Sequence, residues 1–231
     1  MLTKAYPKVG IVNDPRQWFC AAGYEFWFVP GHADIVATMS SSNDGLSGYG
    51  WTTTSLTVTE GSAGDFASSA DVDPTRVATD ASTDLLTSPR IFGSYDHGLV
   101  ASRFLGYMPT KLNAEFYAAF TTNSATELGT FIGFTGPAVT SSDAVNSVGA
   151  ISVGASNFIL TSDTGSDTGA AKDTSWHKWR IAVDAANTEW FIDDVSQGTI
   201  TTMTDIWPTC FKMIATTTNR IALAWVRIYY E

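Results

Sequence analysis

The sequence predicts an all-β protein built as an antiparallel two-sheet sandwich or jelly roll. About a dozen short segments alternate between apolar and polar residues, and turn residues separate them at intervals of about 8–12 residues. No long segment shows the 3.6-residue period of an amphipathic helix. Charged residues make up 16% of the chain and aromatic residues 13%. This balance suits closely spaced strands around an aromatic core.

The N-terminal part contains one clear strand followed by a long polar stretch. Residues 18–29 are strongly aromatic, and residues 35–39 are expected to return as a hairpin partner. Residues 40–88 are rich in Ser, Thr, Gly, Asp and Ala, and only residues 56–58 alternate as a strand does. We expect one sandwich domain over residues 1–231, with 40–88 as a loop-rich insertion or projection.

The middle of the chain contains further strands, expected at residues 99–105, 112–120 and 127–135. Alternation along 112–120 directs every second residue to the core, namely Leu112, Ala114, Phe116, Ala118 and Phe120. Asn113, Glu115 and Tyr117 then face the opposite side. Two shorter strands are expected at residues 150–153 and 158–160, and a polar loop at residues 161–174.

The last third of the chain predicts a meander and a central strand. Residues 176–200 contain three strands joined by turns at residues 184–188 and at Asp193-Asp194. In the first of them, His177, Trp179, Ile181 and Val183 share a face. Residues 221–230 are apolar on both faces, which places this strand in the middle of a sheet.

The order of these C-terminal strands resembles a known family. WHKWRIAVD, EWFIDD and a terminal WVRIYY follow one another as in the C-terminal half of concanavalin A-like lectin/glucanase jelly rolls. NAEFYAAF and GTFIGFT also resemble the mid-chain strand pair of that family. The resemblance covers roughly residues 89–231 and implies an antiparallel two-sheet jelly roll. Members include glycoside hydrolases, lectins, binding modules and structural domains, so the fold alone does not select a function.

Charge, cysteine usage and the termini limit the partners. The formal net charge is −10, from 23 acidic and 13 basic side chains, which disfavours nucleic acid and anionic membranes as partners. Cys20 and Cys210 are expected to be buried thiols, although they could pair if the terminal strands are neighbours. No signal peptide or transmembrane segment is recognisable, so we expect a protein made in a host cytoplasm.

The sequence offers no convincing catalytic pair. In the family that this chain resembles, the members that cleave β-glucans carry Glu-x-Asp-x-x-Glu on one strand. The equivalent strand of this chain contains Glu115 as its single acidic residue. Glu189 and Asp193 share a face, but four strand residues separate them by roughly 13 Å. A retaining pair needs about 5–5.5 Å. We therefore predict no catalytic residues.

Metal and histidine chemistry is not predicted either. His177 is expected to be a satisfied core or rim histidine, and the three histidines lack metal-ligand spacing. Asp163, Asp167 and Asp173 are interpreted as solvated turn residues rather than calcium ligands. We predict no metal and no cofactor.

Three hypotheses on function follow, in decreasing order of preference. The first is a non-enzymatic structural protein of a virion, such as a phage capsid decoration protein or a tail-associated protein. It would assemble with itself, for instance as a trimer, and with a larger scaffold such as a capsid shell. The second is a carbohydrate-binding module that contacts glycans through Asn113, Glu115, Tyr117 and Trp190. In that case Tyr49 and Trp51 are further aromatic candidates, although core filling is the more common role of such residues. A glycosidase with an unusual carboxylate pair ranks last.

Overall fold

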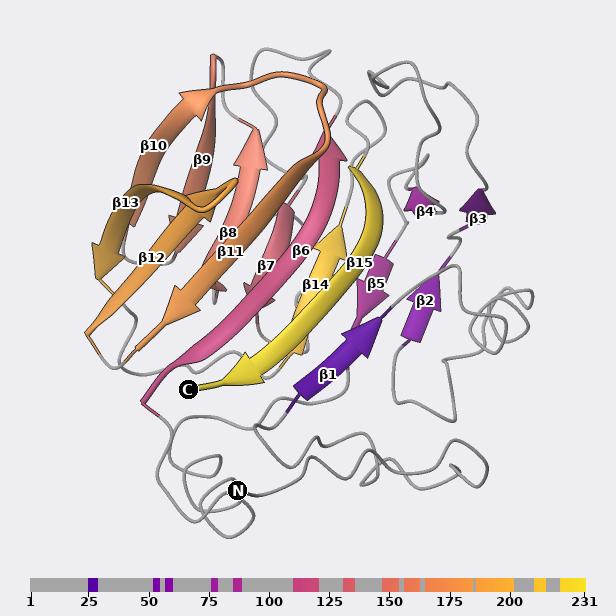
Figure 1. Cartoon of the computed structure of the whole chain (residues 1–231), viewed down its shortest axis with the longest axis horizontal. Coiled ribbons are helices and arrows are strands. Elements are labelled where there is room, and N and C mark those ends of the chain that lie inside the picture. The colour runs from indigo at the N-terminus through magenta and orange to yellow at the C-terminus, as the bar shows by residue number, and fades with distance from the viewer. Residues whose placement is uncertain are drawn as a thin grey trace, which may run out of the picture.

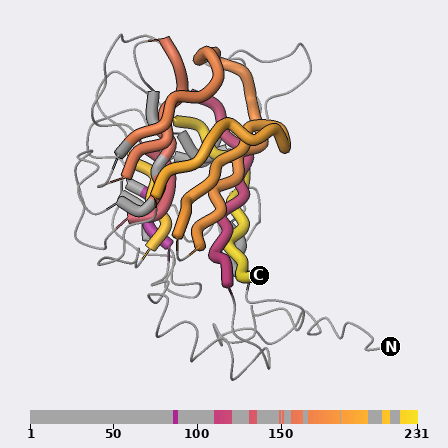
Figure 2. Tube along the Cα trace, turned by 90° about the vertical axis from the view of Figure 1, so that its left-hand side faces the viewer, coloured from indigo at the N-terminus to yellow at the C-terminus, as the bar shows by residue number. Residues whose placement is uncertain are grey.

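The computed structural model describes the chain in segments, which together form 15 β-strands. The described residues are 25–28, 52–54, 57–59, 76–78, 85–88, 110–120, 131–135, 147–153, 156–162, 165–184, 186–201, 210–214 and 221–231. None of them forms a helix long and apolar enough to cross a membrane. The described strands form two antiparallel sheets that lie over one another as two layers (Figures 1 and 2).

One layer is an eight-stranded sheet, and β1 joins it by pairing with β15. Its order is β13 (Val195–Thr201), β12 (Asn187–Ile192), β11 (His177–Val183), β6 (Leu112–Phe120), β15 (Ile221–Tyr230), β4 (Arg76–Ala78) and β3 (Thr57–Thr59), with β1 at Glu25–Phe28. The other layer is a seven-stranded sheet. Its order is β10 (Gly165–Ala171), β9 (Asn157–Ser162), β8 (Ser147–Val153), β7 (Phe131–Thr135), β14 (Cys210–Ile214), β5 (Leu85–Thr87) and β2 (Thr52–Thr54).

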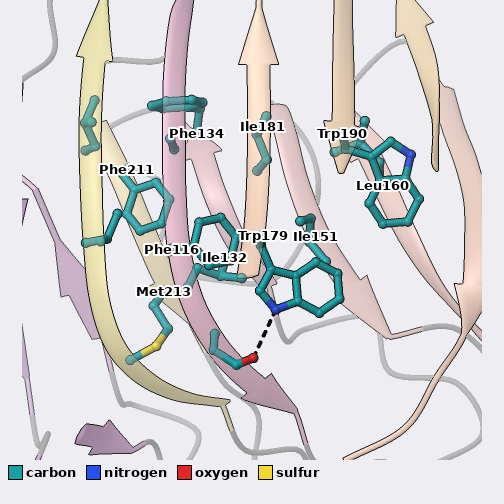
Figure 3. Packing of buried hydrophobic residues seen from close by; sticks show 14 of the residues in the cluster. Phe116, Ile132, Phe134, Ile151, Leu160, Trp179, Ile181, Trp190, Phe211 and Met213 are labelled. Carbon is teal, nitrogen blue, oxygen red and sulfur yellow. Dashed lines mark hydrogen bonds between the residues drawn. The ribbon is translucent and has the colours of Figure 1, made fainter. Parts of the chain in front are cut away.

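Aromatic and aliphatic side chains from both sheets fill the space between the layers (Figure 3). Phe116 of β6 meets Phe211 of β14 across this space, edge to face, with ring centroids 5.6 Å apart. Trp179 is fully buried, and its Nε1–H donates to the carbonyl of Ala118 at 3.0 Å. Burying a large side chain of this kind stabilises a fold by about 1.5–3 kcal/mol, and the hydrogen bond removes the cost of the polar N–H.

The main predictions for the fold are confirmed. The residues of 112–120 that were assigned to the core are all buried, and 177–201 forms the three-stranded meander. β15 lies inside its sheet, between β6 on one side and β1 and β4 on the other. Asp193 and Asp194 have φ values of 49° and 67°, the left-handed turn conformation that Asp tolerates.

The polar loop predicted at residues 161–174 is wrong, because β10 runs through it and pairs with β9. This strand lacks apolar alternation, since it lies against Trp190 and needs little side-chain volume there. A Cβ on Gly169 would come within 2.5 Å of the Trp190 ring, so only glycine fits. Asp167 accepts the Nε1–H of Trp190 at 2.9 Å.

The described part of residues 40–88 belongs to the sandwich. β3 and β4 extend the eight-stranded sheet, while β2 and β5 extend the seven-stranded sheet. The strands expected at residues 35–39 and 99–105 lie outside the described residues, as do Cys20, Tyr49, Trp51 and Asp163. Cys210 is a buried thiol whose Sγ lies 3.4 Å from the carbonyl oxygen of Thr135.

Candidate functional site

The outer face of the eight-stranded sheet brings together residues from four strands. Glu115 on β6 lies in register with Arg180 on β11 and with Arg227 on β15. Tyr117 lies in register with Lys178 and Trp225 on the same two strands. Directly opposite residues on neighbouring strands have Cβ atoms about 4.5–5.5 Å apart, so these side chains form continuous rows across the sheet.

We call this set the sheet-face patch. Its members are all partly exposed and belong to β6, β11, β12, β15 or the segment before β11: Glu115, Tyr117, Trp176, Lys178, Arg180, Phe191, Trp225, Arg227 and Tyr229. The corresponding face of the seven-stranded sheet differs, because every residue of β7 and β14 is buried there. On that face Lys212 is buried, and desolvation lowers its pKa. Along these central strands, only the eight-stranded sheet presents polar and aromatic groups to the outside.

Glu115 is the centre of the charge arrangement in the patch. Its carboxylate lies 3.5 Å from Lys178 Nζ and 3.6 Å from Arg227 Nη1. Lys178 makes a closer pair with Asp194, at 2.6 Å. The hydrogen bond to Asp194 is the largest cause of the raised pKa of Lys178.

Each of the two arginines of the patch lies over an aromatic ring. The guanidinium of Arg180 lies 3.6 Å from the ring centroid of Phe191, and that of Arg227 lies 4.2 Å from the ring centroid of Tyr229. Such contacts contribute about 0.5–1 kcal/mol each at exposed positions. Burial, with a smaller contribution from the charge of Glu115, raises the pKa of Tyr229 and keeps its hydroxyl protonated.

Tyr117 and Trp176 form a second aromatic group at the end of the patch. Their rings stack with centroids 5.3 Å apart and an interplanar angle of 29°. Trp176 also packs against Ala119 and Ala222, whose small side chains leave room for the indole. The stacked pair therefore covers apolar surface while part of each ring stays exposed.

Asn113 lies on the same side of β6 but is fully buried. Neither its amide nitrogen nor its amide oxygen has a hydrogen-bond partner among the described residues. A buried polar group without a partner costs about 1–3 kcal/mol. Because none of it is exposed, Asn113 offers no contact surface to a ligand in this conformation.

His177 forms an ionic cluster at the edge of the patch. Its Nδ1 lies 2.7 Å from Asp193 Oδ2, and its Nε2 lies 3.1 Å from Asp173 Oδ1. Burial lowers the pKa of His177, but the two carboxylates outweigh burial and the pKa is raised overall. Both ring nitrogens face carboxylates, so an imidazolium satisfies the site and neither nitrogen is available as a base. The prediction of a satisfied rim histidine is confirmed.

The comparisons with known proteins concern the fold. No protein-family model matches the chain, and no curated protein matches it in sequence. Among solved structures, the carbohydrate esterase vb_24B_21 from Shiga toxin-encoding bacteriophage phi24B superposes with a TM-score of 0.54 at 10% identity. The match covers 89% of this chain and 97% of that chain. The fold is the concanavalin A-like jelly roll.

Other solved structures match this jelly roll more weakly. An alginate lyase from Corynebacterium sp. gives a TM-score of 0.39 at 13% identity, over 53% of this chain and 59% of that chain. The binding domain of botulinum neurotoxin DC, in complex with rat synaptotagmin II, gives 0.43 at 8% identity, over 75% and 43%. The match to the bacteriophage esterase covers 89% of this chain, so the fold resemblance predicted from the C-terminal strands extends over most of it.

Within this jelly roll, the structure removes Trp190 from the predicted glycan contacts. Trp190 lies among the core side chains (Figure 3). It alternates with Thr188 and Ile192 on the inner face of β12, and no part of it is exposed. Trp190 lies two residues before the apolar Ile192, and residues two apart on a strand share a face. The alternation of the sequence is therefore consistent with an inward-facing Trp190. Phe191, the adjacent residue, is the aromatic side chain of β12 that reaches the outer face.

The site also contains residues that were not predicted from the sequence to belong to it. Arg180, Phe191, Arg227 and Tyr229 face outward by alternation, but only the register between strands shows that they surround Glu115. On the described strands, both register neighbours of Glu115 are arginines rather than acids. No group of three His, Cys, Asp or Glu side chains in the described part of the jelly roll could hold a metal ion.

Proposed function

We propose that this protein is a non-catalytic glycan-binding domain whose binding surface is the sheet-face patch. The observation that carries the proposal is the composition of that face, in which partly exposed aromatic rings alternate with charged groups. Sugar rings have apolar faces that pack on aromatic rings, and hydroxyl groups that hydrogen-bond to charged and polar side chains. An outer sheet face that served only as solvent-exposed surface would not need this many aromatic groups.

The bacteriophage structure supports a sugar ligand. Its name describes a carbohydrate esterase, and it matches almost the full length of both chains. At 10% identity this likeness carries over no residue. The likeness to the esterase nevertheless favours a carbohydrate over the other classes of ligand that proteins with this fold bind.

The surroundings of the acids favour binding over hydrolysis. Glycoside hydrolysis needs two carboxyl groups on either side of one bond, at about 5–5.5 Å for a retaining enzyme. The register neighbours of Glu115 on β11 and β15 are Arg180 and Arg227. His177, which precedes Lys178 of the patch in the chain, has both ring nitrogens directed at carboxylates.

A glycan array followed by calorimetric titration tests the proposal. We expect a defined set of glycans to bind, and Tyr117→Ala to weaken binding about tenfold because it removes one aromatic contact. Tyr117→Phe keeps the ring and is the matched variant, so it should retain most of the affinity. Val195→Ala removes an exposed apolar side chain outside the patch and should change nothing. A blank array across plant, algal, bacterial and animal glycans would overturn the proposal.

A second, compatible proposal concerns where the domain works. The near full-length match to a bacteriophage protein favours a virion component, either a capsid decoration protein or a tail-associated protein. Such a part is expected to form a closed cyclic oligomer, for instance a trimer, and to bind a larger scaffold. Light scattering coupled to sizing chromatography tests this. A strict monomer at high concentration, with no affinity for purified capsids or tails, would contradict it.

A further inference from the structure

Arg180 stands out among the charges of the patch. Its guanidinium contacts the ring of Phe191, and within the described residues no carboxylate pairs with it. Glu115 lies opposite in the strand register, yet its two ion pairs are with Lys178 and Arg227. A cation without a counter-ion is unexpected in a chain that has 23 acidic and 13 basic side chains.

The neighbouring acids are already engaged. Glu189 faces outward on β12, but its Oε1 accepts the Ser196 hydroxyl at 2.8 Å. Asp194 pairs with Lys178. Within the described part of this face, none of these acids forms an ion pair with Arg180.

The stacking contact also orients the guanidinium. A guanidinium that lies over a ring uses its flat face for that contact and leaves its N–H edges directed sideways. Those edges form the fork that binds a carboxylate through two parallel hydrogen bonds. Arg227, stacked on Tyr229, repeats the arrangement two strand spacings away, at about 10 Å.

We propose that the glycan bound by the patch is acidic, and that a sugar carboxylate pairs with Arg180. This inference rests on the glycan-binding function proposed above. The carboxylate supplies the counter-ion that Arg180 lacks, while Glu115 stays in its contacts with Lys178 and Arg227. The exposed parts of Tyr117 and Phe191 contact the sugar rings on either side.

Matched pairs of ligands test the charge requirement with the full chain. Polygalacturonate and its fully methyl-esterified form share one sugar backbone and differ in the carboxylate charge. Sialyllactose and lactose make a second pair, and dextran sulfate and dextran a third. We expect one of the two carboxylated ligands to bind at least tenfold more tightly than its neutral counterpart, with an affinity that falls as salt rises.

Arg180→Gln is the decisive variant, because it removes the charge and the fork. We expect it to weaken binding of the carboxylated ligand about tenfold or more and to weaken binding of neutral glycans much less, so that the preference for the acidic ligand is lost. Lys111→Gln removes one charge from an exposed position outside the patch and should have no effect on binding. Circular dichroism of each variant checks that the sheets are intact.

The outcomes separate the two proposals. If no glycan binds at all, the glycan-binding function itself fails. If neutral glycans bind as tightly as acidic ones, or if Arg180→Gln leaves the preference for acidic glycans intact, only the assignment of an acidic ligand is overturned. Binding of dextran sulfate without either carboxylated ligand would also overturn it.

Discussion

Replacing Asp167 tests whether β10 belongs to the sandwich as the structure shows. Trp190 is fully buried, and its Nε1–H donates to Asp167 Oδ2 at 2.9 Å. Asp167→Ala removes this acceptor and leaves the N–H buried without a partner, which costs about 1–3 kcal/mol. The carboxylate also contacts the backbone of Gly198, where an added Cβ would overlap it, so some packing is lost as well. We expect a total loss of about 2–3 kcal/mol in the free energy of unfolding.

Asp167→Asn is the matched variant, because its amide oxygen still accepts the indole N–H. It should cost only about 1 kcal/mol, the difference between a charged and a neutral acceptor. Urea unfolding measures both values, and the melting temperature should fall by about 2–4 °C per kcal/mol for a chain of this size. In a Trp190→Phe background the indole N–H is absent, so the cost of Asp167→Ala should shrink markedly. If that cost is the same in both backgrounds, the hydrogen bond does not stabilise β10 and the reasoning fails.

Two further predictions concern the stability of the same edge of the sandwich. Gly169→Ala would place a Cβ within 2.5 Å of the buried Trp190 ring, so we expect the free energy of unfolding, measured in urea, to fall by about 1–3 kcal/mol. Thr168→Ala, at the exposed neighbouring position, should not change it. Equal stability of the two variants would contradict the close approach. For His177 the folded-state pKa is raised above its ordinary value of 6.5, so its contribution is fully present below that pH and is lost as pH rises through the folded-state pKa. We therefore expect His177→Ala to destabilise the protein by about 1–2 kcal/mol at pH 6 and by clearly less at pH 9, and a difference that does not change with pH would contradict the ionic cluster.

The sequence was sufficient for the strands that alternate strongly. Residues 112–120 and 177–183 separate inward from outward side chains by simple alternation, because one face of each strand is buried and the other is only partly covered. β10 was missed for a physical reason. It pairs with β9 through its backbone and lies against a large indole, so glycine and small polar residues suit it better than apolar ones.

The candidate site was harder to predict, because it depends on register rather than on alternation. Alternation shows that Glu115, Arg180 and Arg227 face outward, but they are separated by tens of residues in the chain and no local pattern links them. The backbone pairing of β6 with β11 and β15 puts them in one row. The same pairing directs both ion pairs of Glu115 to Lys178 and Arg227 and leaves Arg180 stacked on Phe191.

That distribution of contacts bears on the choice between a binding surface and an inert one. Exposed ion pairs contribute little to stability, about 0–1 kcal/mol each, so stability alone does not require three cations and several rings on this face. The seven-stranded sheet has no exposed charge on β7 and β14, its two central strands, because all of their residues are buried. An arginine that stacks on a ring and pairs with no acid in the described structure adds little to the fold. Its position is better explained by a ligand that completes the pair.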